Sequence, residues 1–571
     1  PQWPLGRGEV PWPLGKGEAE TLRQVLIVHR HGARFPTKPP VPGDLSWPRR
    51  QQFWESYKGH ITPVGCKQLQ DIGTVLSARY PADASAEGLF HGVERIDGRI
   101  VAAYCSNVQR TLQSAWSFLL GFLPSASVFF AFRSERVFSD SLRQAVGVPV
   151  YIEDSNQSDD RLFHEWELQD GYKEWRKQNI RRSPFLLQAA QSPEYLTLLD
   201  KPGTALCDPK LGGGSAPSSA TASEASEVDA LSRLIACKDV DTQVAIAEAH
   251  CRPVLPNRHG IELSGRERGL LRAVGDEVKR RWFGDASGAF ASSWGRRGAG
   301  YLAHKMWRHL QDRANGTCEL RFVDFSCHDT TIAALAAHFG VELPEMGFGA
   351  FFALELHERD GRHEVKVFYN SNPSAGIDSY ASLRPLVLPL GASEKLIPLD
   401  ECPSGCIDLS DFRDHCRIPD IEENFDAFLD LLARVDREPT REALKALLNK
   451  IGWLSFAQWR QRYGSKFQEA DVNGDGRLSH SETQEVLSKS EYVSSDSGGS
   501  ATEKIFRLVD KDPETDQLCE EDVYLAMCAL VGVRGGISSK PGLRMQGASG
   551  APDAGGSGGD GGGDVEAGTG S

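Results

Sequence analysis

The stretch Arg30-His31-Gly32-Ala33-Arg34 decides the fold and function of this chain, and it directly follows the apolar residues 25–28. A short β-branched run of this kind is typical of a buried parallel strand, which we predict over residues 22–28. In an open α/β sheet, ligands bind at the carboxyl ends of the strands. Gly32 allows the backbone to pass close to a bound group, and Pro36 prevents an immediate helix. The sequence therefore predicts a ligand site at residues 30–34.

The side chains of this stretch favour attack on phosphorus. A neutral imidazole such as that of His31 can accept a phosphoryl group covalently, and the guanidiniums of Arg30 and Arg34 suit phosphate oxygens. The tripeptide recurs at Arg258-His259-Gly260, but it follows prolines rather than a strand, and Glu262 stands where the second arginine would be. A carboxylate there would repel phosphate, so we interpret His259 as an ordinary loop residue.

Residues 30–37, Arg-His-Gly-Ala-Arg-Phe-Pro-Thr, resemble the signature of the histidine acid phosphatases, the second branch of the histidine phosphatase superfamily. The resemblance covers roughly residues 21 to 416. It implies an α/β fold in which a central sheet is flanked by helices and carries a mostly helical cap insertion. It also implies that His31 is the nucleophile of a phosphohistidine intermediate and that Arg30 and Arg34 bind the substrate phosphate.

Two further segments place polar residues just after predicted strands. Residues 100–104 read as a strand, and Arg110 follows at the start of a helix, whose N-terminus favours anions. Residues 320–325 read as an alternating strand that ends at His328 and Asp329. The resemblance implies that Arg110 and His328 bind the phosphate and that Asp329 is the general acid. Asp329 is also suited to cap the following helix, a role compatible with catalysis.

The proposed role of Asp329 sets an expectation for pH. A departing alkoxide needs a proton, so Asp329 must hold one at working pH. Nearby arginines oppose this, while burial and a bound phosphate dianion favour it, so we expect an acidic optimum. Related inositol polyphosphate phosphatases have Ala-Glu in place of this aspartate, which favours an acid phosphatase here. Hydrolysis of phytate (an inositol phosphate) or of lysophosphatidate remains the alternative, because the signature is shared and the cap sequence is uninformative.

A second motif lies at residues 471–482, where oxygen ligands stand at the positions of an EF-hand calcium loop. The predicted ligands are Asp471, Asn473, Asp475, the Arg477 carbonyl, Ser479 and Glu482. Residues 510–522 are the expected partner loop, but they lack the central glycine, and Leu518 falls one place late. Either this second loop carries an insertion, or it has lost calcium and serves as a packing partner, and we favour the second interpretation. The calcium is not expected to be catalytic, and no catalytic metal is predicted.

The length of 571 residues predicts several domains. We expect a mobile leader over 1–20, the phosphatase-like domain over 21–416 with a cap insertion over about 123–303 and a flexible insert over 203–228, a helical connector over 417–452, an EF-hand pair over 453–533, and a disordered tail over 534–571. A catalytically silent phosphatase-like scaffold around a calcium module is the non-enzyme alternative. The presence of His31, Arg34 and Asp329 favours the enzyme.

The net charge of −14 argues against nucleic acid or an anionic membrane as a partner. The partner implied by the resemblance is a small phosphomonoester substrate. The apolar stretch 115–132 reads as a buried helix followed by a strand rather than a membrane span. Proline at position 1 indicates a processed or truncated end. Twelve cysteines, sequons at Asn156 and Asn315, and a segment Cys402–Cys406 that resembles a disulfide loop of the family favour the secretory lumen or the extracellular space. The oligomeric state is left open.

Overall fold

The structure is a computed structural model of the chain. It describes residues 12, 14–37, 48, 50–81, 88–132, 147–152, 160–168, 171–200, 222–251, 263–284, 298–343, 345–376, 378–390, 395–416, 460, 467–472, 474–479, 482 and 517–519. The chain divides into two compact units, Pro1–Ile421 and Glu422–Ser571, each of which is described by itself. The predicted connector and tail, and most of the second EF-hand loop, lie outside the described residues.

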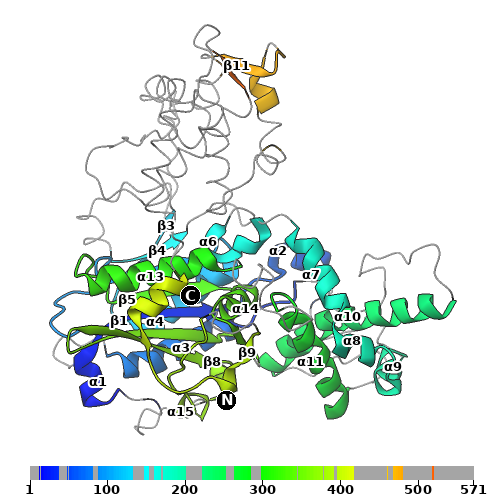
Figure 1. The fold of residues 1–571 in the computed structure, drawn as a ribbon, viewed down its shortest axis with the longest axis horizontal. Helices are drawn as coiled ribbons and strands as arrows, with labels where there is room; N and C mark the ends of the chain where they lie inside the picture. The colour runs from blue at the N-terminus through cyan, green and yellow to red at the C-terminus, as the bar shows by residue number, and fades with distance from the viewer. Residues whose placement is uncertain are drawn as a thin grey trace, which may run out of the picture. The chain divides into compact units, whose positions relative to one another are not determined.

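The first unit contains a mixed eight-stranded sheet in the order β10-β8-β7-β1-β5-β2-β4-β3 (Figure 1). The strands are β1 (Leu22–Arg30), β2 (Val101–Cys105), β3 (Val128–Phe132), β4 (Val148–Ile152), β5 (Phe322–Cys327), β7 (Phe351–Arg359), β8 (Arg362–Asn370) and β10 (Ile407–Asp408). Neighbours from β1 to β3 in this order are parallel, whereas β7, β8 and β10 join antiparallel. The predicted α/β sheet is therefore present, with an antiparallel extension.

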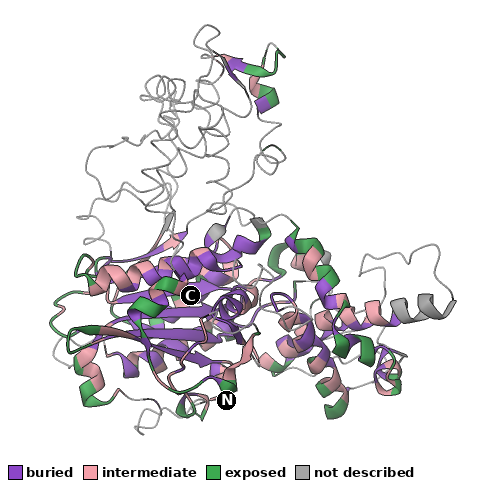
Figure 2. Cartoon of the chain, viewed as in Figure 1, coloured by how far each residue is buried: buried purple, intermediate pink, exposed green. Residues whose placement is uncertain are grey.

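Strand β1 lies at the centre of the sheet and is buried on both faces, as its continuous apolar run predicts (Figure 2). Val25 and Ile27 pack on one face in a core shared with helices α3 (Pro63–Arg79) and α4 (Gln109–Phe122), while Leu26 and Val28 belong to the core on the other face. Strand β5 is also buried at every position, so the prediction of an alternating strand there was wrong. It lies between β1 and β2 and has no solvent-facing side.

Helices cover both faces of the sheet. Helix α3 begins at Pro63, and the Thr62 side chain accepts a hydrogen bond from the Gly65 amide. Helix α4 ends at Phe122 and is followed by strand β3, as expected for the apolar stretch. The other face is covered by α13 (Gly300–Ala314), α14 (Asp329–His338) and α16 (Leu409–Cys416). Across the part of the chain that the structure describes, no helix combines the length and apolar character that crossing a membrane requires.

The insertion begins later than predicted. Strands β3 and β4 belong to the central sheet, so the expected start at about residue 123 was wrong, and the helical insertion follows Ile152. Its helices group beside the sheet (Figure 1). They are α6 (Arg161–His164), η3 (Glu165–Leu168), α7 (Tyr172–Arg181), α8 (Pro184–Ala189), α9 (Pro193–Asp200), α10 (Ala222–Ala249) and α11 (Gly265–Arg280). The predicted flexible insert falls largely outside the described residues.

Strands β7 and β8 form a hairpin. Asp360 and Gly361 connect the strands with φ angles of 49° and 75°, a turn that places both central residues in the left-handed region. The register pairs Arg359 with Arg362 and continues to Phe351 opposite Asn370. Aspartate and glycine tolerate these φ values better than most residues, which explains why the sequence signal at this turn is reliable.

The leader is not wholly mobile. Trp12 is buried, its backbone carbonyl accepts a hydrogen bond from Arg79 Nη1 at 2.8 Å, and its ring lies 3.9 Å from the Arg79 guanidinium carbon. Residues Lys16–Thr21 form helix α1, and Glu18 there pairs with Lys366 of β8. The expectation of a mobile leader was therefore wrong for this segment, because a buried arginine and a lysine on the sheet fix it. Residues 1–11 lie outside the described residues.

Candidate active site

Three neighbouring parallel strands deliver the predicted site residues to one edge of the sheet. His31 follows β1, His328 and Asp329 follow β5, and Arg110 lies in the first turn of α4 after β2. The rings of His31 and His328 have centroids 5.5 Å apart, and Arg110 Nη2 lies 3.3 Å from His328 Nδ1. Residues that are distant in the chain thus meet in one place, because the strands that carry them are adjacent in the order β1-β5-β2.

The loop after β1 is held by close backbone packing. A Cβ added to Gly32 would lie 2.3 Å from the Gly65 carbonyl oxygen, and one added to Gly65 would lie 2.0 Å from the Ala33 carbonyl oxygen. Gly32 is therefore required by contact with the start of α3 rather than with a bound ligand, which corrects the sequence interpretation. The amides of Gly32 and Ala33 donate to Ser114 Oγ and Gln68 Oε1, at 3.1 and 2.9 Å. These contacts fix the backbone on either side of the candidate nucleophile.

The tautomer of His31 follows from its hydrogen bond. Its Nδ1 lies 2.9 Å from the Gly32 carbonyl oxygen, which can only accept, so Nδ1 carries the proton. A neutral ring then has a lone pair on Nε2. Burial lowers the pKa of His31 well below its ordinary value, and the charges of Arg110, Arg30 and Arg34 lower it further. The imidazole is therefore neutral, with a nucleophilic Nε2, even under mildly acidic conditions.

Two buried arginines, Arg30 and Arg34, and the partly buried Arg110 surround this imidazole. Burial lowers the pKa of Arg34 to about 9 and that of Arg110 to about 10, and the charge of Arg30 contributes to both shifts. Arg30 packs over the Phe348 ring at 4.4 Å and donates from Nη1 to the Met346 carbonyl. Among the described residues, the buried Nε–H groups of all three arginines have no hydrogen-bond partner. Buried donors without partners are costly, so this arrangement favours an acceptor-rich anion.

Asp329 is the carboxylate that faces these arginines. Its Oδ2 lies 3.0 Å from Arg30 Nη2, and its Oδ1 accepts a hydrogen bond from the Thr330 amide at 2.9 Å. Burial by itself would raise the pKa of Asp329, but the charges of Arg30 and Arg34 outweigh it and lower that pKa well below its ordinary value. The free protein therefore holds Asp329 ionised. One carboxylate faces three guanidiniums, so the site retains an excess of positive charge.

His328 is oriented by a chain of hydroxyl groups. Its Nε2 lies 3.0 Å from Ser106 Oγ, which in turn lies 2.9 Å from Thr111 Oγ1. Because Arg110 can only donate, Nδ1 of His328 accepts, and the ring proton is on Nε2. As arranged here, His328 orients Arg110. Donation from Nδ1 to a phosphate oxygen, the role that the resemblance implies, requires a proton at that nitrogen.

Sequence reasoning missed a third histidine at the site. His164, at the end of α6, has its ring centroid 4.9 Å from that of His328, and its Nδ1 lies 3.3 Å from Asp160 Oδ2. Asp160 also caps α6 by accepting from the Phe163 amide. The i,i+4 spacing of Asp160 and His164 was a usable signal. The side chain of Arg161 and residue His259 are not among the described parts of the chain.

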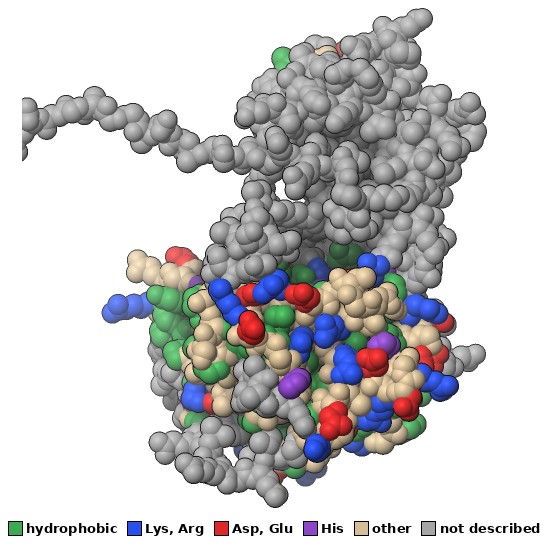
Figure 3. Space-filling model, turned by 90° about the vertical axis from the view of Figure 1, so that its left-hand side faces the viewer, with side chains coloured by type: hydrophobic (Ala, Val, Ile, Leu, Met, Phe, Trp, Pro, Cys, Tyr) green, Lys and Arg blue, Asp and Glu red, His purple; other side chains and the backbone are tan. Residues whose placement is uncertain are grey.

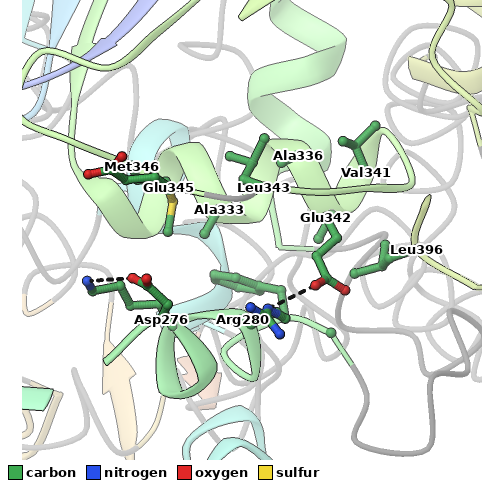
Figure 4. Close-up of a pocket in the computed structure, with 14 residues that line it drawn as sticks. Asp276, Arg280, Ala333, Ala336, Val341, Glu342, Leu343, Glu345, Met346 and Leu396 are labelled. Carbon is green, nitrogen blue, oxygen red and sulfur yellow. Dashed lines mark hydrogen bonds and ion pairs between the residues drawn. The ribbon is translucent and has the colours of Figure 1, made fainter. Parts of the chain in front are cut away.

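A narrow pocket lies between α11 and α14 (Figure 4). It contains none of the predicted site residues, although the backbone of Met346, which lines it, is bonded to Arg30. Four of its charged side chains form two pairs: Arg280 Nε lies 2.9 Å from Glu342 Oε1, and Lys279 lies 3.4 Å from Asp276. Lysine, arginine and acidic side chains are also interspersed over one exposed face (Figure 3). The two cations of this pocket thus have acidic partners of their own, whereas the three arginines around His31 share Asp329.

The second unit contains the predicted calcium loop. Asp471 accepts from the amides of Asp475 and Gly476, at 3.1 and 2.7 Å, and Glu482 accepts from the Val472 amide at 3.0 Å, so the loop ends are drawn together. Gly476 has a φ of 77°, in agreement with the expected turn. Asn473 is not described. Across the described residues, no three His, Cys, Asp or Glu side chains converge as a preformed metal site, so calcium binding stays a prediction.

A short antiparallel ladder joins the two loops. Strand β11 (Arg477–Ser479) pairs with β12 (Gln517–Cys519), and the register places Leu478 opposite Leu518. Both leucines are buried. The apparent one-residue offset of Leu518 in the sequence therefore does not prevent it from pairing with the apolar residue of the first loop.

The segment Cys402–Cys406 and the sequons were both interpreted as signs of an oxidising compartment, and the structure agrees with only one of these two features. Cys402 is buried, Cys406 is exposed, and both are free thiols, so the disulfide suggested by the resemblance is not formed. Asn315 is exposed in the turn after α13, where a sequon is accessible. The sequon at Asn156 lies outside the described residues.

Comparisons with known proteins agree with this geometry over part of the chain. Residues 21–177 match the model of the histidine phosphatase superfamily (branch 2). Lysosomal acid phosphatase of Xenopus laevis is 33% identical over 107 residues, which are 19% of this chain and 22% of that protein. The chain thus matches about a fifth of the length of this curated relative.

Solved structures are also similar over a larger part of the chain. The apo form of Hafnia alvei phytase is 16% identical, with 69% of this chain and 96% of that chain covered and a TM-score of 0.42. The Bifidobacterium longum multiple inositol polyphosphate phosphatase, in complex with inositol hexasulfate, is 12% identical, with 65% and 90% covered and a TM-score of 0.40.

Proposed function

We propose that this protein is a phosphomonoesterase that works through a phosphohistidine on His31. One observation carries the proposal. Three buried arginine Nε–H groups without partners surround an imidazole whose Nε2 carries a lone pair. A phosphate dianion supplies both the negative charge and the acceptors that this site lacks. The match of residues 21–177 to the histidine phosphatase superfamily supports the same chemistry.

The first step is attack of His31 Nε2 on the phosphorus atom. A P–N bond forms, the ester P–O bond breaks, and the leaving oxygen takes a proton from Asp329. The three guanidiniums stabilise the charge on the equatorial oxygens of the transferring group. In the second step, water attacks the phosphorus atom, Asp329 takes a proton from that water, and the P–N bond breaks. Phosphate and free His31 are regenerated.

Asp329 reaches its acidic form through substrate binding. In the free protein its pKa is held low because Arg30 and Arg34 face it. A bound phosphate dianion offsets those charges and raises the pKa of Asp329, so that the carboxyl can hold a proton at acid pH. The same offset favours a second proton on His328, which then donates to the phosphate. Substrate binding and loading of the general acid are therefore coupled.

The proposal is tested by trapping the intermediate. The purified chain is mixed with a ³²P-labelled aryl phosphate at acid pH and quenched within milliseconds. Stoichiometric label that is stable in alkali and labile in acid identifies a phosphoramidate on the protein. His31→Ala must abolish the label, while the exposed His91→Ala serves as a matched control. Turnover without such a label, or label retained in His31→Ala, would overturn the proposal.

The substrate class divides into two proposals. The aspartate at position 329, where related inositol polyphosphate phosphatases carry Ala-Glu, favours a general acid phosphatase. Phytate, other inositol phosphates and lysophosphatidate form the alternative class. A panel of phytate, lysophosphatidate, phosphotyrosine and sugar phosphates, compared by kcat/KM, decides between them.

We further propose that residues 471–482 bind calcium without taking part in catalysis. Three features support this: carboxylates at both ends of the loop, the φ of Gly476, and the pairing of Leu478 with Leu518. Asp471, Asn473, Asp475, Ser479, Glu482 and the Arg477 carbonyl would supply oxygen ligands. Isothermal titration with calcium tests this, with Glu482→Gln as the variant expected to lose binding.

The similarity to lysosomal acid phosphatase of Xenopus laevis and the exposed Asn315 sequon support a secretory compartment for this protein.

A further inference from the structure

A buried pair of titratable residues lies on the two strands that lead into the site. His29 on β1 and Asp324 on β5 are fully buried, and His29 Nε2 lies 3.3 Å from Asp324 Oδ1. Both side chains face the layer of α3 and α4, since each lies two residues along its strand from the core residues Ile27 and Phe322. Ser326 lies opposite His29 in the register. The pair thus joins β1 to β5 just beneath the catalytic residues.

The hydrogen bonds of the pair require a proton between its members. His29 Nδ1 lies 3.1 Å from the Arg30 carbonyl oxygen, which can only accept, so Nδ1 carries a proton. In a neutral ring, Nε2 then carries a lone pair that points toward Asp324. Among the described residues, neither oxygen of Asp324 has a hydrogen bond of good geometry, and the Phe325 amide is the one backbone donor that favours its ionised form. An ionised Asp324 beside a neutral His29 would therefore place two acceptors face to face in a fully buried position, at a cost that burial makes severe.

We propose that His29 and Asp324 hold one proton between them and that this protonated pair positions Arg30 and His31 for catalysis. The proton lies between Asp324 Oδ and His29 Nε2, and the pair is neutral overall. The other ring nitrogen of His29, Nδ1, donates a hydrogen bond to the carbonyl oxygen of Arg30, the residue that precedes His31. His29 and Asp324 are thus positioning residues that act through the backbone of the signature loop.

The surroundings of the pair contain few other charges. Two thiols lie near the pair, Cys105 of β2 and Cys327 of β5, and burial raises the pKa of both. Helix α4 contributes the Phe118 ring, which stacks on His29 at 5.2 Å, and its charged group nearest the site is Arg110. On β7, Glu355 is engaged by Arg79 of α3. Burial raises the pKa of Asp324, in agreement with a proton retained there.

The shared proton makes the pair most stabilising in the acid range. In the unfolded chain, histidine binds a proton below about pH 6.5 and aspartate below about pH 3.9. Between these values the folded and unfolded pairs both hold one proton, so stability does not change with pH. Above about pH 6.5 only the folded pair holds it, and below about pH 3.9 the unfolded pair holds two. Stability contributed by the pair falls in both directions.

The test compares the full chain with Asp324→Asn, which supplies a permanent N–H donor to His29 without a titrating proton. The folding equilibrium constant of the wild type, divided by that of Asp324→Asn, is measured by urea unfolding between about pH 4.5 and 7. It is expected to fall about tenfold per pH unit as pH rises, because folded Asp324 keeps a proton that the unfolded residue has lost. A ratio that does not change with pH would overturn the proposal.

Two measurements cover the positioning role and the case of a poorly folding variant. The ratio of kcat/KM at pH 5.5 to kcat/KM at pH 8 is expected to be larger for the wild type than for Asp324→Asn. At acid pH, Asp324→Asn should remain active, whereas Asp324→Leu should lose activity. In ¹⁵N-histidine-labelled wild type, assigned with His29→Phe, the His29 Nε2 signal is expected to show a hydrogen bond to Asp324 that Asp324→Leu loses; a signal unchanged in Asp324→Leu would overturn the proposal. The activity arm rests on the proposed function, whereas the unfolding and NMR arms do not, so the two failures are distinguishable.

Discussion

Two buried arginine clusters on the same sheet differ in how completely their charges are satisfied. Arg79 meets Glu355 through Nε and Nη2 at 2.9 and 2.6 Å, and Glu355 also binds Tyr80 OH at 2.6 Å and His357 Nε2 at 3.1 Å. In the other cluster, three guanidiniums face Asp329.

The difference teaches how to separate structural from functional ion pairs. A carboxylate that accepts hydrogen bonds from several donors is part of a complete network, and removing it lowers the free energy of unfolding. A set of buried cations with unpartnered donors is incomplete until an anion arrives. The fold places arginine beside carboxylate in both clusters, and only the arrangement of donors tells them apart.

Removing the nucleophile should give the largest effect. His31→Ala is expected to lower turnover of an aryl phosphate at least roughly 10⁴-fold, because no other group forms the covalent bond. Steady-state assays at acid pH measure it, with circular dichroism to show that the variant is folded. If His31→Ala kept a tenth of the wild-type rate, His31 would not be the nucleophile, and the functional role assigned to the Asp329 cluster would be contradicted.

The second variant tests the carboxylate of the incomplete cluster. Asp329→Asn is expected to slow hydrolysis of an alkyl phosphate by roughly 10²- to 10⁴-fold, because the leaving alkoxide lacks its proton. Hydrolysis of p-nitrophenyl phosphate should suffer much less, since that leaving group is stable without one. Equal losses for the two substrates would instead assign Asp329 to phosphate binding.

The matching change in the satisfied cluster should act on stability. Glu355→Gln is expected to lower the free energy of unfolding by about 3–5 kcal/mol, since Arg79 is left as an uncompensated buried charge. Urea unfolding gives this number. The kcat per folded molecule should stay at the wild-type value. A selective loss of kcat with unchanged stability would contradict the assignment of this cluster as structural.

The pH dependence of stability offers a smaller effect in the incomplete cluster. The folded pKa of Asp329 lies below its unfolded value of about 3.9, so its pairing with Arg30 stabilises fully above that pH and is lost as pH falls through the depressed pKa. The stability advantage of the wild type over Asp329→Asn should therefore shrink below about pH 4. Paired urea titrations between pH 3 and 5 measure it; an advantage that grows on acidification would reverse the sign.

Calcium removal should give the smallest effect on catalysis. The proposed ligands lie in the unit Glu422–Ser571, and no step of the proposed reaction uses a metal. EDTA at acid pH is therefore expected to leave kcat/KM unchanged within about twofold, whereas it should lower the thermal stability of a calcium-loaded loop. Loss of turnover on chelation, restored by calcium, would show that the two units are coupled.

Sequence alone was sufficient for the strands that carry the site. The run before His31 was identified as a continuous apolar stretch and the run before His328 as an alternating one, because strand patterns that end directly in polar clusters are unusual. Gly32 was also singled out, but for the wrong partner, since contact with Gly65 depends on packing between segments. His164 and the pairing of His29 with Asp324 were missed for the same reason: each joins elements far apart in the chain, and only the folded sheet brings them together.

The position of β5 between β1 and β2 has a consequence for synthesis of the protein. Both flanking strands leave the ribosome long before β5, so an early chain holds His31 and the three site arginines with a gap in the sheet. Under the proposed function, hydrolysis is expected only once residues 322–327 insert and carry His328 and Asp329 into place. Activity would then report completed sheet assembly, and prematurely terminated chains should be inert.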